Sequence, residues 1–244
     1  MKKLINNKPV GLVIAENYES TTVALHHPCL RQVSPDLTAI EVSVLECATA
    51  GCSAVWVCCD ESMQPLVRKK LGDYVKDPVI LNKSNFTNYP EDNRINIPIY
   101  FYSPHPKDRL RRSGPVWDLF NAMLAIYHFS HKFSRWLSPD KYYISFCQGL
   151  YDFSGLTSYR KKFIHESSFL LESEGQNMFT GGLLGACLTG DFVKQTIIQL
   201  KSGKINPPEG ILRFSHLAPP SPIELIKINQ YFTCDSWKSY VEYI

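Results

Sequence analysis

The sequence predicts a three-layer α/β/α fold with a mostly parallel sheet, and three observations support that prediction. Continuous apolar runs at residues 10–15 and 53–58 suit strands that are buried on both faces. Segments with helical periodicity separate these runs, which is typical of a parallel sheet covered by helices. The 244 residues, 44% of them hydrophobic, are enough to bury a sizeable core. We therefore expect one domain over residues 1–244.

The first part of the chain is expected to form two strand–helix units. The strand at residues 10–15 precedes a polar, turn-rich loop and a helix over residues 38–50, which Gly51 is expected to stop. A second strand at residues 53–58 leads into a helix over residues 61–75, whose basic C-terminal half suits the helix dipole. Both crossovers are expected to be right-handed.

The central part adds two strands and a long helix. Residues 77–96 are expected to be irregular, and residues 98–102 to form a strand. A long helix is expected over residues 115–136, because Pro115 suits a first helical turn. Residues 142–147 then predict another strand.

The C-terminal part is less regular, and the pattern of residues 148–176 favours no single element. An apolar, glycine-rich stretch and a short helix follow, and the tail contains two short apolar segments and a closing helix. These segments are residues 179–188, 192–200, 211–216, 231–234 and 236–244.

Ligands of parallel sheets bind at the carboxyl ends of the strands. This rule singles out the loops that follow Ala15, Cys58, Cys147 and Cys234. The sequence has no G-x-S-x-G, P-loop or H-E-x-x-H motif, so the common hydrolase, P-loop and zinc-protease sites are not predicted.

Charge and cysteine usage limit the partners and the compartment. The net charge of +3 is too small to predict nucleic-acid binding, and the basic run at residues 107–112 is interpreted as a solvated loop. The eight cysteines show no C-x-x-C spacing, which indicates reduced thiols rather than a zinc site. We find no signal peptide and no apolar run of membrane-spanning length, so a cytoplasmic protein without a membrane span is expected.

Two segments resemble a known family. The first is residues 13–59, in which residues 28–33 (PCLRQV) precede the predicted helix that ends at Ala50-Gly51. The second is residues 234–240 (CDSWKSY), near the end of the chain. In this order they are similar to the Pro-Lys step and the terminal Asp-[Thr/Ser] signature of the sugar nucleotidyltransferases. That family makes nucleotide sugars on a glycosyltransferase-A-like fold. Weaker similarities are Ser113-Gly114 and residues 179–182.

The resemblance implies a nucleotide-diphospho-sugar transferase-like fold and a set of site residues. It implies that Asp235 binds a catalytic Mg²⁺, that Asp152 could stand in for the family's first metal-binding aspartate, and that Arg31 could replace the family's lysine. It also implies substrate-binding positions at Ser113, Gly114, Gly181 and Gly182. Each aspartate has a structural alternative, because Asp152 suits a loop or helix cap and Asp235 suits the N-cap of the closing helix.

The catalytic motifs of the family are degraded in this sequence. The loop at residues 16–22 has no glycine and no arginine, and its two glutamates would repel a triphosphate. Cys29 lies at the position of the family's lysine, and a neutral thiol cannot offset phosphate charge. Gly149 or Leu150 occupies the position of the first metal-binding aspartate. These losses favour a protein that does not catalyse nucleotidyl transfer.

Two functions from different classes therefore stay open. The first is a non-catalytic binding or assembly module, which would bind a nucleotide, a nucleotide sugar, a protein partner or a second copy of the chain and would need no cofactor. The second is a Mg²⁺-dependent sugar nucleotidyltransferase or glycosyltransferase that uses Arg31, Asp152 and Asp235. A minor alternative is a thiolate nucleophile or metal site at His26-His27 and Cys29.

Overall fold

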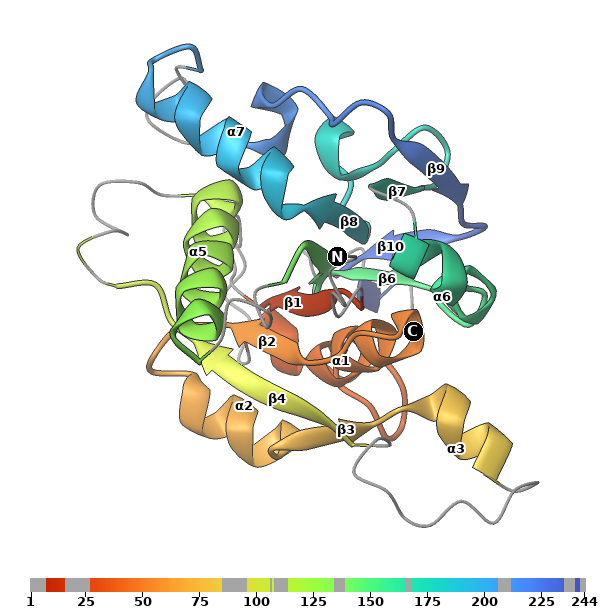
Figure 1. The fold of residues 1–244 in the computed structure, drawn as a ribbon. Coiled ribbons are helices and arrows are strands. Elements are labelled where there is room, and N and C mark those ends of the chain that lie inside the picture. The colour runs from red at the N-terminus through yellow and green to blue at the C-terminus, as the bar shows by residue number, and fades with distance from the viewer. Residues whose placement is uncertain are drawn as a thin grey trace, which may run out of the picture.

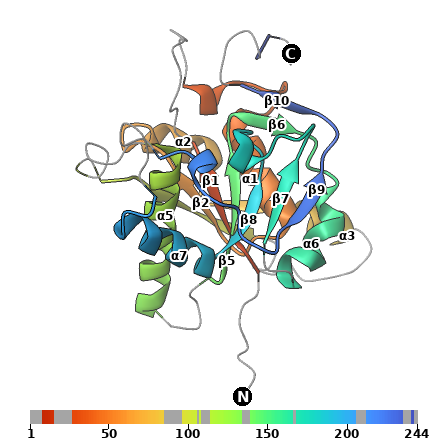
Figure 2. The same cartoon turned by 90° about the horizontal axis from the view of Figure 1, so that it is seen from above.

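The computed structural model describes residues 8–15, 27–84, 96–105, 107, 114–133, 139–165, 168–205, 212–234 and 240–241. An eight-stranded sheet forms its centre (Figures 1 and 2). In spatial order its strands are β3 (Tyr74–Lys76), β4 (Asn96–Tyr102), β2 (Val55–Cys58), β1 (Val10–Ile14), β5 (Lys141–Phe146), β8 (Ala186–Thr189), β7 (Phe169–Glu172) and β9 (Glu224–Lys227).

The middle of the sheet is parallel, as predicted. Strand β1 pairs in parallel with β2 and β5, and β2 pairs in parallel with β4. Strands β3 and β8 are antiparallel to their neighbours, and β9 is again parallel to β7. A separate antiparallel ribbon is formed by β6 (Gly149–Tyr151) and β10 (Tyr231–Thr233).

Helices cover both faces of the sheet and complete the three predicted layers. Helices α1 (Ala39–Ala50), α2 (Gln64–Leu71) and α6 (Leu156–His165) pack on one face, and α5 (Pro115–Phe133) and α7 (Gly190–Lys201) pack on the other (Figure 2). The strands supply both cores because successive side chains point to opposite faces. Thus Val55 and Val57 belong to the α1 side, whereas Trp56 and Cys58 belong to the α5 side.

Local sequence explains where α1 begins and ends. The Thr38 backbone N–H donates to the Glu41 carboxylate at 2.8 Å, which forms one half of a capping box. Gly51 has a left-handed φ of 86°, and the Cys52 N–H donates to the Cys47 carbonyl at 3.2 Å. This is the hydrogen bond of a Schellman C-cap, in which Cys52 and Cys47 also make the apolar contact.

Two predictions between residues 61 and 96 were wrong. The helix expected over residues 61–75 is shorter, because α2 ends at Gly72, whose φ of 73° suits glycine, and Tyr74–Lys76 pairs with β4 as β3. The segment expected to be irregular contains α3 (Pro78–Ser84). The Asp77 side chain starts this helix by accepting the Val79 N–H at 2.9 Å.

The remaining expectations are met in part. The strands expected at residues 98–102 and 142–147 correspond to β4 and β5, and the long helix to α5. Strand β9 was not predicted, and the unassigned stretch at residues 148–176 forms β6, α6 and β7. Most of the first loop, the basic run and the closing helix lies outside the described residues. Within the described part of the chain, no helix combines the length and apolar character needed to cross a bilayer.

Candidate functional site

The carboxyl ends of β1, β2 and β5 lie side by side, at the edge where the sequence placed a ligand site. The Ala15 N–H donates to the Cys58 carbonyl at 2.9 Å, and the Cys147 N–H donates to the Ile14 carbonyl at 3.1 Å. Ala15, Cys59 and Cys147 follow the three strands and are each at most 2% exposed. Cys29, in the 3₁₀ helix Pro28–Leu30, packs in the same apolar cluster. We call Ala15, Cys29, Cys59 and Cys147 the thiol cluster.

Two thiols of this cluster, those of Cys29 and Cys147, are held in the neutral form. Burial, reinforced by the neighbouring Cys59, raises the pKa of Cys29 to about 12. Burial also raises the pKa of Cys147 well above its ordinary value. The His27 Nδ1 atom lies 2.9 Å from the Cys29 Sγ atom, yet burial and the nearby Arg31 lower the pKa of His27. The pair is therefore a neutral hydrogen bond and not the thiolate–imidazolium pair of a nucleophile.

Arg31 connects the two segments that carried the sequence resemblance. Its side chain is buried, and its Nη1 atom donates to the Cys234 carbonyl at 2.6 Å. The guanidinium carbon lies 5.7 Å from the centre of the Tyr240 ring. Its Nη2 atom has no hydrogen-bond partner among the described residues. The structure thus brings Arg31 next to the residue that precedes Asp235, while Asp235 itself lies outside the described residues, as does Ser113.

Asp152 lies at the opposite end of the β6–β10 ribbon from Cys234. Tyr151 pairs with Tyr231, whereas the Cys234 N–H donates to the Gln148 carbonyl at 2.7 Å beyond the other end. Asp152 is exposed, and its carboxylate accepts the Ser154 N–H at 2.9 Å just before α6. The hydrogen bonds from Ser154 lower the pKa of Asp152. This geometry is that of an Asx turn in the loop before α6, which is the loop alternative, and a metal role for Asp152 stays a prediction.

The described residues alone do not fit a Mg²⁺ ion. Among them, no group of three His, Cys, Asp or Glu side chains converges closely enough to hold a metal. Mg²⁺ prefers hard carboxylate oxygens. The cluster at the ends of β1, β2 and β5 presents soft, protonated thiols instead.

The predicted substrate-binding glycines lie at turns. Gly114 has a φ of 123° and precedes α5, where its carbonyl accepts the Trp117 N–H at 3.1 Å. Gly181 has a φ of 103° and ends the 3₁₀ helix Met178–Thr180. A Cβ at Gly182 would approach the Asn177 backbone to 3.2 Å, so close packing accounts for this glycine. Their role in substrate binding stays a prediction.

Glu46 forms a buried polar network that sequence reasoning missed. Its carboxylate accepts hydrogen bonds from the Tyr143 and Ser145 hydroxyls, at 2.6 Å each, and from the Tyr151 hydroxyl. Burial raises the pKa of Glu46 to about 7, against the lowering effect of these donors. The network joins α1 to β5 and β6. Helical periodicity alone gave no signal for it, because a glutamate on a helix is normally exposed.

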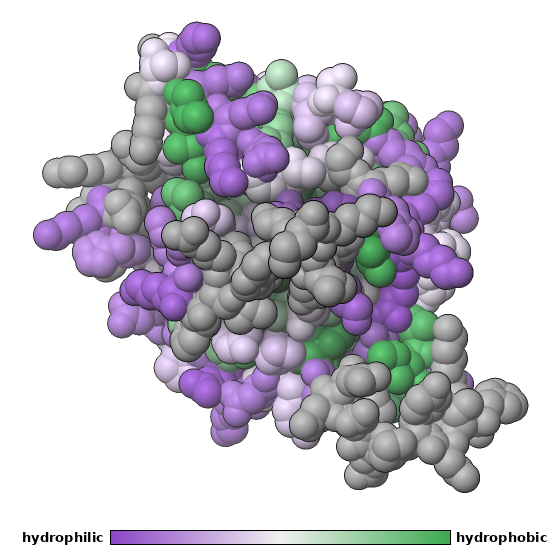
Figure 3. Space-filling view, viewed as in Figure 1, coloured by the Kyte–Doolittle hydropathy of each residue, from purple (hydrophilic) through white to green (hydrophobic). Residues whose placement is uncertain are grey.

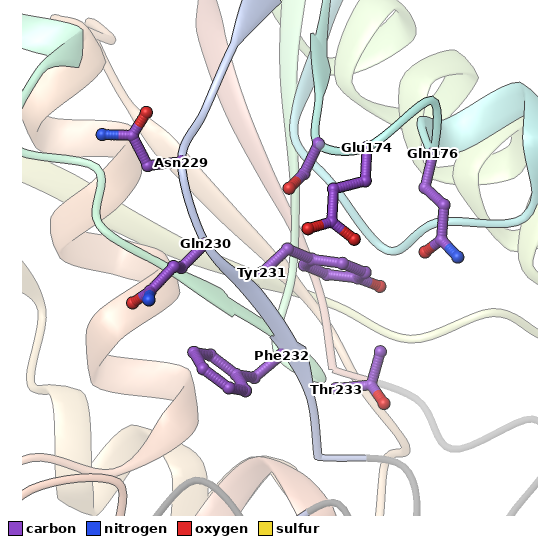
Figure 4. Close-up of a pocket in the computed structure, with 8 residues that line it drawn as sticks. Glu174, Gln176, Asn229, Gln230, Tyr231, Phe232 and Thr233 are labelled. Atoms are coloured by element: carbon purple, nitrogen blue, oxygen red, sulfur yellow. The ribbon is translucent and has the colours of Figure 1, made fainter.

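A polar pocket opens at the end of β7, and sequence reasoning missed it too. Its volume is about 420 Å³, and the described residues that line it are Ser173, Glu174, Gln176, Asn229, Gln230, Tyr231, Phe232 and Thr233 (Figure 4). Because β7 and β5 are both antiparallel to β8, the pocket lies at the same edge of the sheet as the thiol cluster. The one sequence signal was Gly175, which suits a tight turn.

The surface shows no dominant apolar face in the view of Figure 1. Hydrophobic residues appear there in several separate places among hydrophilic ones (Figure 3). Elsewhere, Tyr100 and Phe129 are 40% and 46% exposed, with ring centres 6.4 Å apart. This small aromatic pair is the one place where exposed rings of different elements meet among the described contacts.

Solved structures resemble this chain over almost its whole length. One is a protein from Bacillus anthracis assigned as a glucose-1-phosphate thymidylyltransferase and bound to sucrose, with a TM-score of 0.61 and 7% identity over 96% of this chain and 92% of that one. Another is a UDP-glucose pyrophosphorylase bound to UDP-glucose, with a TM-score of 0.58 and 12% identity over 97% of both chains. A protein from Mycobacterium tuberculosis H37Rv gives a TM-score of 0.55 and 9% identity, over 96% of this chain and 97% of that one.

The chain has the fold of the sugar nucleotidyltransferases. The fold implied by residues 28–33 and 234–240 is therefore confirmed, and identities of 7% to 12% mark a divergent sequence on that fold. No protein-family model and no curated protein matches the sequence. Because one fold can carry unrelated functions, activity has to be argued from the site.

Proposed function

We propose that this chain is a divergent nucleotidyltransferase-like protein that does not transfer nucleotidyl groups and acts as a binding or assembly module. The observation that carries the proposal is the thiol cluster. Transfer of a nucleotidyl group needs cations or a metal at the phosphates, because negative charge must be offset as the bond breaks. Cys29 instead places a neutral thiol, with a pKa of about 12, beside Cys59 and Cys147 in the thiol cluster.

Burial of the cluster supports the same proposal. Cys29, Cys59 and Cys147 are each 1% exposed, so their side chains contribute packing and leave almost no surface for a ligand. Thiols are favourable there because the desolvation of a small apolar side chain costs little. Residues that must contact a triphosphate would instead keep charged or backbone N–H groups accessible.

A nucleotide panel tests the proposal. The melting temperature of the full chain is measured with nucleoside triphosphates and nucleotide sugars, with and without Mg²⁺, alongside pyrophosphate release from each triphosphate plus glucose 1-phosphate. We expect no Mg²⁺-dependent rise and no pyrophosphate. A ligand at about 100 times its dissociation constant would add about 2.7 kcal/mol, so binding would be visible.

The second candidate is a Mg²⁺-dependent sugar nucleotidyltransferase or glycosyltransferase, and Arg31 is the observation that favours it. A buried guanidinium whose Nη2 atom is unpartnered among the described residues is a group that an anion could satisfy. In this hypothesis Arg31 would bind phosphate, and Asp152 and Asp235 would hold the metal. A Mg²⁺-dependent rise in melting temperature that Asp235→Ala abolishes would establish this candidate and overturn the first.

A further inference from the structure

The polar pocket at the end of β7 is built on one tight backbone turn and the segment that contains β10. Ser173 and Gln176 exchange backbone hydrogen bonds of 3.0 and 2.8 Å across a tight turn. Opposite this turn runs the segment Asn229–Thr233, which includes β10. Figure 4 shows the side chains of Glu174, Gln176, Tyr231 and Thr233 on one side of β10, and those of Gln230 and Phe232 on the other.

The pocket presents hydrogen-bonding groups that the protein does not use. No residue in the described part of the chain bonds to the side chains of Glu174, Gln176, Asn229 and Gln230. Figure 4 shows Asn229 and Gln230 on the far side of β10 from Glu174, whereas Gln176 lies on the same side as Glu174. One carboxylate and one carboxamide therefore offer donors and acceptors on that side of the cavity. Tyr231, in contrast, is fixed, because its hydroxyl accepts the Leu183 N–H at 2.6 Å. Its ring forms a fixed wall beside these polar groups.

The backbone at Glu174 adopts a left-handed conformation that is strained for a glutamate. Glu174 has a φ of 51° and Gly175 a φ of 79°, the left-handed pair of a type I′ turn. Glycine and asparagine adopt this conformation readily, whereas glutamate does so at a cost. A glutamate kept in such a place, at the mouth of a cavity, points to a use for the carboxylate.

The charge of the pocket selects against phosphate. Glu174 is the one charged side chain among the described lining residues, so its field is negative. Lys227 is paired in register with Glu172 on the neighbouring strands and does not line the cavity. A phosphate beside Glu174 would meet like-charge repulsion without a cation to offset it. The same carboxylate can accept hydrogen bonds from two hydroxyl groups of an uncharged ligand.

We propose that this pocket binds a neutral, unphosphorylated carbohydrate. Adjacent hydroxyls of a sugar ring match the carboxylate of Glu174 and the carboxamide of Gln176, and the Tyr231 ring provides a wall for the apolar ring face. The cavity volume of about 420 Å³ equals the volume of about fourteen waters, room for one or two sugar rings. The site needs neither Mg²⁺ nor the thiol cluster, so it is independent of nucleotidyl transfer.

Saccharide titration of the full chain tests this proposal. Glucose, N-acetylglucosamine, maltose and sucrose are titrated by saturation-transfer NMR and calorimetry without Mg²⁺, with glucose 1-phosphate as the charged counterpart of glucose. We expect saturable binding of at least one neutral saccharide and weaker binding of glucose 1-phosphate. Glu174→Gln should weaken the neutral saccharide about tenfold, because a charge-assisted acceptor is lost, and should reduce the discrimination against glucose 1-phosphate.

Two further variants separate the site from general effects. Glu61→Gln removes the same charge from an exposed position beyond β2, at the same edge of the sheet, and should leave saccharide binding unchanged. Gln176→Ala removes the exposed amide that lies on the same side of β10 as Glu174 and should weaken binding. The proposal is overturned if no neutral saccharide binds up to about 20 mM, a limit far weaker than typical specific sites. It is also overturned if Glu174→Gln and Gln176→Ala both bind like the unaltered chain, or if glucose 1-phosphate binds more tightly than glucose.

These outcomes are distinct from those of the nucleotide panel. If no saccharide binds and no pyrophosphate is released, the saccharide proposal is overturned and the proposed function is not. If pyrophosphate is released and a neutral saccharide binds, the proposed function is overturned and the saccharide proposal is not.

Discussion

Two regions at one edge of the sheet differ in almost every physical property. At the ends of β1, β2 and β5, the thiol cluster is apolar, neutral and at most 2% exposed. At the end of β7, three strand spacings or about 14 Å from β1, polar side chains surround an open cavity. The fold offers the same opportunity in both places, because strand ends gather loops from separate parts of the chain.

The contrast between the two regions extends to their glutamates. Glu46 is buried, and its carboxylate accepts hydrogen bonds from hydroxyls of β5 and β6. Glu174 is exposed and has no bonding partner among the described residues. A carboxylate whose oxygens already accept hydrogen bonds within the protein stabilises the fold. A carboxylate at a cavity without such bonds is available to a ligand. We infer that binding on this chain belongs to the end of β7 and not to the ends of β1, β2 and β5.

Cys29→Lys is the strongest test of that contrast, because it puts back the residue type that the family resemblance expects. A lysine there would bury an ammonium beside Cys59 and Cys147 and close to Arg31. We expect a loss of about 4 kcal/mol in the free energy of unfolding, because a buried cation without a carboxylate partner is costly. Urea unfolding measures this loss.

Cys29→Ala is the matched control, and it should cost only about 1 kcal/mol because it removes one sulfur from the cluster. If Cys29→Lys were as stable as Cys29→Ala and gained Mg²⁺-dependent binding of a triphosphate, the strand ends would be a latent nucleotide site. The contrast between the two regions would then fail.

The Glu46 network predicts a pH dependence of stability. Its folded pKa of about 7 lies above the ordinary value of 4.5, so folding favours the protonated form. The stability from this group is fully present below pH 4.5 and is lost as the pH rises through 7. This rise in the pKa, from 4.5 to about 7, corresponds to about 3 kcal/mol.

Urea unfolding at pH 5 and pH 8 measures that loss, and Glu46→Gln serves as its reference. Because a glutamine side chain cannot titrate, the variant should lose about 3 kcal/mol less than the unaltered chain between these pH values, whatever its own stability. Equal slopes for the two proteins would show that Glu46 stays ionised in the fold. The Glu46 carboxylate would then be ionised, and the contrast in environment between Glu46 and Glu174 would be smaller than the structure indicates.

The core of the fold could be predicted from sequence, because continuous apolar runs mark strands buried on both faces. Residues 10–15 and 53–58 contain β1 and β2, and the stop at Gly51 is observed as a left-handed C-cap. The predictions failed where the decisive contact is distant in sequence. Tyr74–Lys76 becomes a strand because β4 pairs with it, and no local pattern records that partner.

The site was less predictable than the fold. The matches at residues 28–33 and 234–240 led to Arg31, and the structure does place its guanidinium on the Cys234 carbonyl. The burial of the thiol cluster could not be predicted from Cys29 alone, because it depends on Cys59 and Cys147, which follow two different strands. The polar pocket could not be predicted for the same reason, because its two walls lie more than fifty residues apart in the chain.

Glu174→Asn gives the smallest expected effect and the sharpest distinction between stability and binding. The change produces an Asn-Gly pair in the type I′ turn, and asparagine adopts the left-handed conformation more easily than glutamate. We expect a gain of about 1 kcal/mol, seen as a rise in melting temperature of about 2–4 °C for a chain of this size. The shorter, uncharged side chain should at the same time weaken saccharide binding.

Glu174→Ala separates the two effects, because alanine removes the same carboxylate but remains strained at a φ of 51°. It should weaken saccharide binding as Glu174→Asn does, without the rise in melting temperature. A chain that becomes more stable when its glutamate is replaced, and loses a ligand in the same step, keeps that glutamate for binding. If Glu174→Asn instead lowered the melting temperature, the Glu174 carboxylate would stabilise the turn. The polar pocket would then have a structural role, as the thiol cluster has.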